Sequence, residues 1–104
     1  MLKIIAHDEA TEEILSLPTI LQGQMIRLIE RLEVEGNRLR LPHSRVIGGG
    51  LFELRVGGKN IARSLYAYAS GENIYLLKAF VKKTQTTPSN EIKIARKRLQ
   101  ELTK

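Results

Sequence analysis

Three cationic residues stand in successive segments of the second half of the chain, and each segment alternates apolar and polar side chains. They are Arg55, Arg63 and Lys82. Alternation of this kind is typical of strands with one buried face. Because residues two positions apart on a strand point to the same side, Glu53 shares a face with Arg55. Clustered cations on a rigid sheet suit a site that holds a phosphate and stabilises the charge that develops on it.

Arg55 and Arg63 lie on neighbouring predicted strands that a short turn connects. Antiparallel pairing would bring them within reach of one ligand, because cross-strand neighbours are about 5 Å apart. Two adjacent arginines repel each other unless an anion or Glu53 lies between them. An ordinary surface salt bridge between Glu53 and either arginine explains the same residues, so both interpretations stay open.

Cleavage of RNA without a metal ion also needs groups that transfer protons. The 2′-oxygen must lose a proton and the leaving 5′-oxygen must gain one. Histidine is the usual residue for this task, but His7 and His43 are isolated in the sequence and are interpreted as surface or capping residues. Glu53 is therefore a candidate base. Lys82 or Lys83 is a candidate acid or base, because neighbouring cations lower the pKa of a lysine.

Further polar residues could contact RNA beyond the scissile phosphate. On the last predicted strand, Lys78 shares the face of Lys82, and Lys83 points to the opposite face. The basic run near the C-terminus could follow phosphates, although a solvated helix face explains it equally well. Three tyrosines could stack on bases, but positions in the core or on the sheet surface are the preferred interpretation for Tyr66, Tyr68 and Tyr75. The predicted RNA-binding residues are Lys78, Lys83, Thr84, Gln85, Lys93 and Lys97.

The composition indicates which partners suit such a site. The length of 104 residues predicts a single domain over residues 1–104. The formal net charge is +6, but residues 1–37 carry three cations and seven anions, whereas residues 38–104 carry fourteen cations and four anions. This distribution predicts one acidic face and one face that binds a polyanion, with a solvated basic surface as the alternative.

Several functional classes are disfavoured. The chain has no cysteine, which excludes disulfides and thiolate metal sites and fits a cytosolic protein. The basic half holds only four acids, too few for a two-metal nuclease, so we expect neither a metal nor a small-molecule cofactor. No apolar run reaches the roughly 18 residues of a membrane span, and the apolar residues after Lys3 are too few for a signal peptide. We therefore expect a cytoplasmic protein that does not contact a membrane.

A strand and two helices are expected in the N-terminal part. Residues 2–6 read as a short strand. Acids crowd the start of a first helix at Asp8, where the positive end of the helix dipole favours them. Pro18 suits the first turn of a second helix, whose apolar residues recur at spacings of three and four and which Gly36 ends. These two helices form a hairpin with an acidic exterior.

The remaining elements place the cations. Residues 38–50 read as a loop because they contain Pro42 and three glycines. Three strands follow, with a hairpin turn at residues 57–60, and then a helix in which Thr87 caps the first turn and Pro88 takes the first position. The predicted order β-α-α-β-β-β-α is an α+β fold with a small, mainly antiparallel sheet, an N-terminal helical hairpin and a C-terminal helix. The three strands are expected at residues 51–56, 61–69 and 74–83.

Three stretches carry a resemblance to a known family. They are Gly50-Leu-Phe-Glu-Leu-Arg55, Ala62-Arg63-Ser-Leu-Tyr66, and Phe80-Val-Lys-Lys-Thr-Gln-Thr-Thr-Pro88 with Glu91-Ile92 and Ala95 after it. On these residues the chain resembles the RelE/ParE toxin superfamily, in its HigB-like, phage-derived branch. The resemblance extends over nearly the whole chain, in the same order of elements, and implies a RelE-like fold.

The resemblance implies a toxin of a type II toxin–antitoxin system. Such toxins cleave mRNA, commonly on the translating ribosome, and a helix-turn-helix antitoxin neutralises them. By position, Arg55 and Arg63 would hold the scissile phosphate, and Lys82 and Lys83 would occupy the cationic end of a strand. RelE-type sites usually draw a tyrosine or histidine from the final segment, where this chain has threonines and Gln85. The general acid and base therefore stay unassigned.

Two other functions remain open on the same residues. A ParE-like inhibitor of DNA gyrase would have this fold and perform no chemistry. A non-catalytic nucleic-acid-binding module would show salt-dependent binding and no growth arrest. The cations at Arg55, Arg63 and Lys82 on one sheet favour the nuclease.

Overall fold

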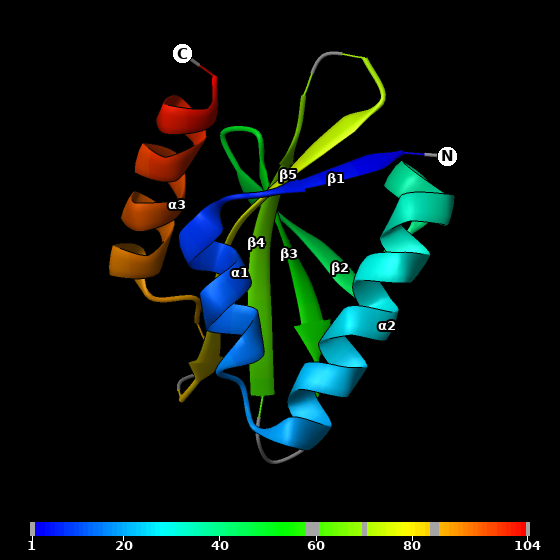
Figure 1. Ribbon diagram of the computed structural model, residues 1–104, viewed down its shortest axis with the longest axis vertical. Helices are drawn as coiled ribbons and strands as arrows, with labels where there is room; N and C mark the ends of the chain where they lie inside the picture. Colours follow the sequence, from blue (N-terminus) through cyan, green and yellow to red (C-terminus); the bar gives the residue numbers. More distant parts are fainter. Residues whose placement is uncertain (1, 58–60, 70, 84–85, 104) are drawn as a thin grey trace.

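The computed structural model describes residues 2–57, 61–69, 71–83 and 86–103. Within these residues, one sheet of five strands is flanked by three helices (Figure 1). The predicted α+β class is confirmed, as is the C-terminal helix. The elements are β1 (Lys3–Ala6), α1 (Asp8–Leu15), α2 (Thr19–Glu35), a short 3-10 turn η1 (Gly36–Arg38), β2 (Ser44–Gly48), β3 (Leu51–Val56), β4 (Ile61–Tyr68), β5 (Asn73–Lys82) and α3 (Ser89–Leu102).

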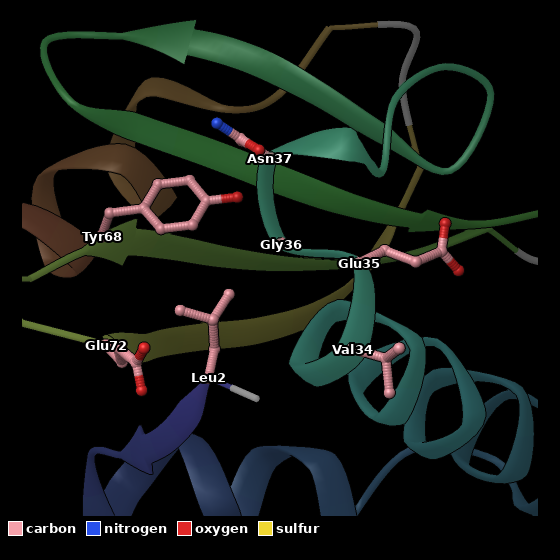
Figure 2. Close-up of a pocket in the computed structure, with 7 residues that line it drawn as sticks. All are labelled: Leu2, Val34, Glu35, Gly36, Asn37, Tyr68 and Glu72. Atoms are coloured by element: carbon pink, nitrogen blue, oxygen red, sulfur yellow. The ribbon is translucent and has the colours of Figure 1, made fainter.

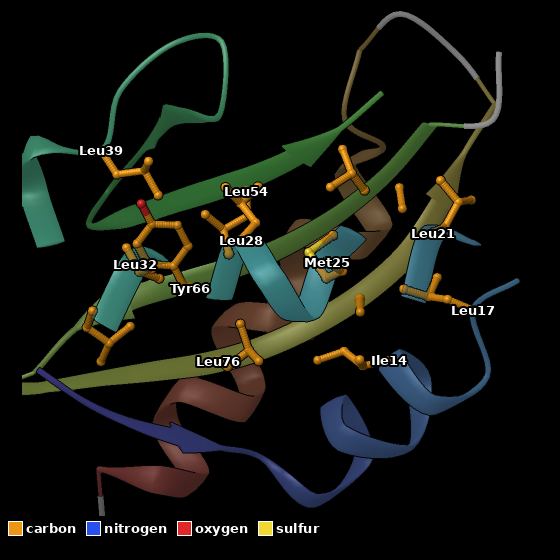
Figure 3. Packing of buried hydrophobic residues seen from close by; sticks show 14 residues of the cluster. Ile14, Leu17, Leu21, Met25, Leu28, Leu32, Leu39, Leu54, Tyr66 and Leu76 are labelled. Carbon is orange, nitrogen blue, oxygen red and sulfur yellow. The ribbon is translucent and has the colours of Figure 1, made fainter. Parts of the chain in front are cut away.

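The sheet has the strand order β1-β5-β4-β3-β2, and only the β1–β5 pair is parallel. The prediction of a mainly antiparallel sheet is therefore confirmed. One buried cluster joins α1 and α2 to one face of the sheet (Figure 3). A second cluster joins α3 to the opposite face, and Figure 1 shows α2 and α3 at opposite sides of the strands. The sheet thus lies between two helical layers.

The apolar spacing of α2 fixes which side of this helix faces the sheet. Leu21, Met25, Leu28 and Leu32 are buried in the first cluster, as their spacing of three and four residues predicts. Pro18 occupies the N-cap position rather than the first turn, so that part of the prediction is wrong by one residue. A fixed proline φ is compatible with either place, which the sequence does not distinguish.

The predicted loop over residues 38–50 is wrong, because it contains β2. This strand pairs antiparallel with β3, with Arg45 opposite Glu53. Gly49 (φ 59°) and Gly50 (φ 85°) make the tight reversal between the two strands. At Gly49 a Cβ would also lie 2.8 Å from the guanidinium of Arg96, which donates to the carbonyl oxygens of Gly48 and Gly49. The glycines that indicated a loop belong to a hairpin.

The start of α3 also differs from the prediction. Pro88 is the N-cap residue, and no side chain caps this helix. Thr87 therefore does not cap α3; its hydroxyl donates to Glu53 instead. The apolar stripe is confirmed, since Ala95 is buried and Ile92 and Leu99 pack against the second cluster. Of the predicted turn at residues 57–60, residues 58–60 lie outside the described part of the chain.

Glutamates of α1 meet cations of β5 and α3 across the outer edge of the sheet. Arg98 is buried and donates to both carboxylate oxygens of Glu13 (2.8 and 2.9 Å) and to the carbonyl oxygen of Leu77 (2.9 Å). Glu13 also accepts from the backbone N–H of Ala79 (3.1 Å). Here β5 extends beyond β1, so these two side chains satisfy backbone groups that would otherwise have no strand partner. Charge patterning of α1 alone did not indicate this role.

Candidate functional site

A single glutamate lies at the centre of a cluster of cations on the α3 face of the sheet. The Glu53 side chain is 0% exposed. Its Oε1 lies 3.3 Å from Nε of Arg45, 3.8 Å from Nε of Arg55 and 3.6 Å from Nε of Arg63. Its other oxygen, Oε2, accepts a hydrogen bond of 2.6 Å from the hydroxyl of Thr87. Glu53 is therefore a buried counterion for three arginines, and the interpretation as an ordinary surface salt bridge is wrong.

Strand pairing explains why these side chains meet. Arg45 is opposite Glu53 across β2 and β3, and Arg55 is opposite Arg63 across β3 and β4. Residues that face each other across a ladder share a side of the sheet, and so do residues two apart on one strand. Lys82 pairs with Ile61, two residues before Arg63, which places Lys82 on the same side. The predicted proximity of Arg55 and Arg63 is confirmed.

The cations differ in how much solvent they reach. The side chains of Arg45 and Arg55 are 42% and 30% exposed, whereas that of Arg63 is 4% exposed. The backbone fixes the guanidinium of Arg63, because its Nη1 donates to the carbonyl oxygens of Ala62 (3.0 Å) and Val56 (3.4 Å). The accessible surface of the cluster is thus made by Arg45 and Arg55, and Arg63 lies underneath them.

The cluster has an excess of positive charge and unused hydrogen-bonding capacity. Four cations (Arg45, Arg55, Arg63 and Lys82) surround one carboxylate, a formal net charge of +3. Among the described residues, Oε1 of Glu53 and the Nε atoms of Arg55 and Arg63 are buried without a hydrogen-bond partner. A buried polar atom left in this state costs about 1–3 kcal/mol. An oxyanion bound beside the guanidinium groups would relieve part of that cost.

Burial and repulsion change the protonation of two members of the cluster. Burial lowers the pKa of Lys82, and the positive charge of Arg63 lowers it further, against the opposing attraction of Glu53. Burial also lowers the pKa of Arg63, although Glu53 opposes this. Lys82 therefore loses its proton more readily than an ordinary lysine, which suits a group that transfers protons.

Among the described residues, none of the other predicted RNA-binding lysines forms an ion pair with Glu53. Lys78 lies on the same side of the sheet, but its Nζ is 3.0 Å from Glu13 and 3.5 Å from Glu91, so it belongs to the ion pairs that join α1, β5 and α3. Lys83 is exposed just after β5. Thr84 and Gln85 lie outside the described residues. Lys93 and Lys97 are exposed on α3.

Sequence reasoning missed two members of the site, Arg45 and Thr87. Arg45 stands in the alternation Ser44-Arg45-Val46-Ile47, which would have indicated a strand had the neighbouring proline and glycines not favoured a loop. Thr87 precedes Pro88, and this pair reads more readily as a helix start. No local signal links Thr87 to a carboxylate 34 residues away.

His7, Tyr66 and Tyr68 lie away from the buried carboxylate. His7 accepts from the N–H of Glu9 at the start of α1 and contacts Glu101 (2.8 Å), so its interpretation as a capping residue is confirmed. Tyr66 and Tyr68 belong to the first buried cluster, on the face opposite to the cations. Burial raises the pKa of Tyr66 to about 12, and its hydroxyl lies 2.6 Å from that of Ser44.

A separate cavity, which shares no residue with the Glu53 cluster, does not suit a phosphate. Figure 2 shows this cavity between the end of α2 and the sheet, with Tyr68 and Leu2 in its wall, and its volume is about 330 Å³. Among the described residues, its charged lining residues are the acids Glu35 and Glu72, without a cation. Gly36 is required here, because a Cβ would lie 2.7 Å from the side chain of Leu2.

Two further properties of the described residues concern metal binding and insertion into a membrane. They include no group of three or more histidines and acids placed to hold a metal ion. We also find among them no helix with the length and apolar character to span a bilayer.

Comparison with known proteins assigns the chain to a family. The family model described as "Phage derived protein Gp49-like (DUF891)" matches residues 12–100. A search of curated proteins found no match. The matched region runs from α1 to the end of α3 and includes every residue of the Glu53 cluster. The chain therefore belongs to the phage-derived Gp49-like family, a RelE-like family of toxins from toxin–antitoxin systems, which implies a cognate antitoxin as a partner.

Proposed function

We propose that this protein is a HigB-like toxin of a type II toxin–antitoxin system that cleaves mRNA in the cytoplasm, at the ribosome, without a metal ion. A helix-turn-helix antitoxin is the proposed neutralising partner. The observation that carries the proposal is the buried Glu53, which holds the guanidinium groups of Arg45, Arg55 and Arg63 together beside Lys82. Cations that are fixed before the substrate arrives need no reorganisation when charge develops.

The arginines would stabilise the phosphate during cleavage. The 2′-oxygen attacks the adjacent phosphorus, the bond from phosphorus to the 5′-oxygen breaks, and negative charge builds on the nonbridging oxygens. Arg55 and Arg45 are exposed enough to contact those oxygens. Arg63 is buried beneath them and adds positive potential at short range. The products are a 2′,3′-cyclic phosphate and a 5′-hydroxyl.

Lys82 is the proposed acid that protonates the leaving 5′-oxygen, and the 2′-proton passes to water. Its lowered pKa eases the release of the proton. Glu53 is a less suitable base than its sequence position suggests, because it is fully buried and already accepts from Thr87. We assign Glu53 to the positioning of the arginines.

Growth arrest in cells that express the toxin without its antitoxin tests the site. Arg55→Ala and Arg63→Ala should each relieve the arrest, whereas Lys3→Ala, an exposed change on β1 at the far edge of the sheet, should not. Folding of each variant is checked by circular dichroism. If both arginine variants arrest growth fully while folded, the proposed site is wrong.

Primer extension on cellular mRNA after induction tests the reaction. A nuclease produces new 5′ ends in the wild type that are absent for Arg63→Ala. A poison of gyrase leaves transcripts uncut and induces the response to DNA damage, and a simple nucleic-acid-binding module produces neither effect. Either of these results would exclude the nuclease.

A further inference from the structure

A cationic cleft, distinct from the Glu53 cluster, lies between α2 and the end of β3. Its volume is about 280 Å³, and within the described part of the chain no acid lines it. Arg27 and Arg31 line it from α2, His43 from the residue before β2, and Arg55 from β3. Leu28 and Val56, both members of the first buried cluster, line its apolar part.

The helix repeat brings the two α2 arginines to this cleft. Arg27 and Arg31 are four residues apart, so they lie on the same side of α2. Leu28, next to Arg27 in the sequence, packs in the core and so fixes the orientation of α2 relative to the sheet (Figure 3). These two arginines are two of only three cations in residues 1–37. The sequence predicts an acidic exterior for the two N-terminal helices, but α2 has one basic side.

Backbone pairing holds the remaining wall of the cleft. The N–H of Arg55 donates to the carbonyl oxygen of His43 at 2.8 Å, which fixes the chain before β2 against the end of β3. Arg31 forms an exposed ion pair with Glu35 (2.8 Å). Within the described residues Arg27 forms no ion pair, so its charge is available to a ligand.

Arg55 belongs to both sites. It lines the cleft, and its Nε is 3.8 Å from the buried carboxylate of Glu53. The cleft lies on the α2 side of the sheet and the Glu53 cluster on the α3 side, so Arg55 is where a negatively charged chain would pass round the end of β3 from one site to the other. Guanidinium groups match phosphate oxygens in charge and in hydrogen-bond geometry.

We propose that this cleft is a second phosphate subsite, which holds a further phosphodiester of the substrate RNA beyond the scissile one. The inference rests on the proposed nuclease function for the identity of the substrate. Its role is to bind and align the strand, so Arg27 and Arg31 are binding residues that take no part in the proton transfers.

Binding of a short single-stranded RNA with 2′-O-methyl groups, which cannot be cleaved, tests the subsite directly. Arg27→Ala and Arg31→Ala should each raise Kd about two- to fivefold, the range of an exposed ion pair. Each should also reduce the slope of log Kd against log salt by about 0.7, the value for one phosphate on a single strand. Alanine favours helix at these exposed positions, so both variants keep α2. Lys3→Ala is the matched control and should change neither quantity.

Cleavage of the corresponding unmodified RNA separates this inference from the proposed function. Arg27→Ala should raise KM and leave kcat unchanged, in contrast to Arg55→Ala. If the wild type binds RNA but leaves it uncut both free and on ribosomes, the nuclease is wrong while the binding measurement still decides the subsite. If Arg27→Ala and Lys3→Ala give the same Kd and salt slope, the subsite is wrong. An effect of Arg27→Ala on binding to ribosomes alone, with none on the oligonucleotide, also overturns it, because the phosphate would then belong to ribosomal RNA.

Discussion

Replacement of Glu53 by glutamine removes the charge that holds the cluster together and keeps the shape of the side chain. Glu53 is the common counterion of Arg45, Arg55 and Arg63. In Glu53→Gln the formal net charge of the cluster rises from +3 to +4. The variant should therefore be less stable than the wild type and bind anions more tightly.

The burial of each pair sets the size of the effect on stability. Arg45 and Arg55 are 42% and 30% exposed, so water screens their attraction to Glu53 and their share is small. Arg63 is buried like Glu53, and removal of one partner of a buried pair costs about 3–5 kcal/mol. We expect about 3 kcal/mol, a large part of the roughly 5–15 kcal/mol that stabilises a domain of this size. At about 4–8 °C per kcal/mol, Tm should fall by roughly 12–24 °C.

Thermal unfolding with and without inorganic phosphate measures both effects. If the cluster binds anions only in the folded state, as proposed, phosphate should raise Tm of each protein. The increase should be larger for Glu53→Gln, because phosphate replaces the missing counterion. Glu72→Gln, at an exposed position just before β5, is the matched control and should lower Tm little.

Two results would refute this reasoning. If Glu53→Gln unfolds at the temperature of the wild type, Glu53 does not hold the arginines. If phosphate raises Tm of both proteins equally, the cluster is not where the anion binds.

A further measurement on Glu53→Gln concerns catalysis. If Glu53 is the general base, its replacement should lower kcat by about 10²–10⁴ and remove the acidic limb of the pH–rate profile. If Glu53 only positions the arginines, the acidic limb should stay in place.

Three other changes test neighbouring parts of the argument. Because the proposed acid must be protonated, kcat should fall as pH rises through the lowered pKa of Lys82, and Lys82→Arg should move that fall to higher pH in a pH–rate profile. Arg98→Met should lower the free energy of unfolding by about 3 kcal/mol in urea, and Lys97→Met by less than about 0.5 kcal/mol. Burial alone would raise the pKa of Glu13, but its hydrogen bonds from Arg98, the backbone of Ala79 and Lys78 outweigh this and lower it. The effect of Arg98→Met should therefore be full above the ordinary pKa of Glu13 and decrease as pH falls through the lowered one. Thr87→Val should cost about 1.5–3 kcal/mol through the lost hydrogen bond to Glu53, measured by urea unfolding, and Thr87→Ser, which keeps the hydroxyl, should cost less.

Periodicity predicted the elements that carry a long, unbroken pattern. The spacing of apolar residues along α2 and the alternation along β3 and β4 each indicated the observed element. The short strand β2 was missed because five residues between Pro42 and Gly49 give too little alternation to outweigh those two signals. Its partner β3 supplies the hydrogen bonds that make it a strand, and that pairing is not visible locally.

The same limit explains which site residues the sequence predicted. Arg55 and Arg63 were predicted together because one turn connects their strands and the register follows from it. Arg45 depends on β2 and was missed with it. The burial of Glu53 depends on Thr87 and on three arginines from three strands, so its role as a counterion could not be separated from a surface ion pair before the tertiary contacts were known.

The contacts also change the meaning of the uneven charge along the chain. The acidic first part and basic second part do not form two separate faces. Glu9 and Glu13 form ion pairs with Arg98, and Glu13 also pairs with Lys78, so the acids of α1 neutralise cations that the composition alone assigned to a polyanion. Arg27, from the acidic part, lines a cleft with Arg55 instead. Around Glu53 the cations outnumber the single carboxylate that they share, so a positive charge remains there. Position in the fold, rather than position in the sequence, therefore determines which positive charges remain for an anionic ligand.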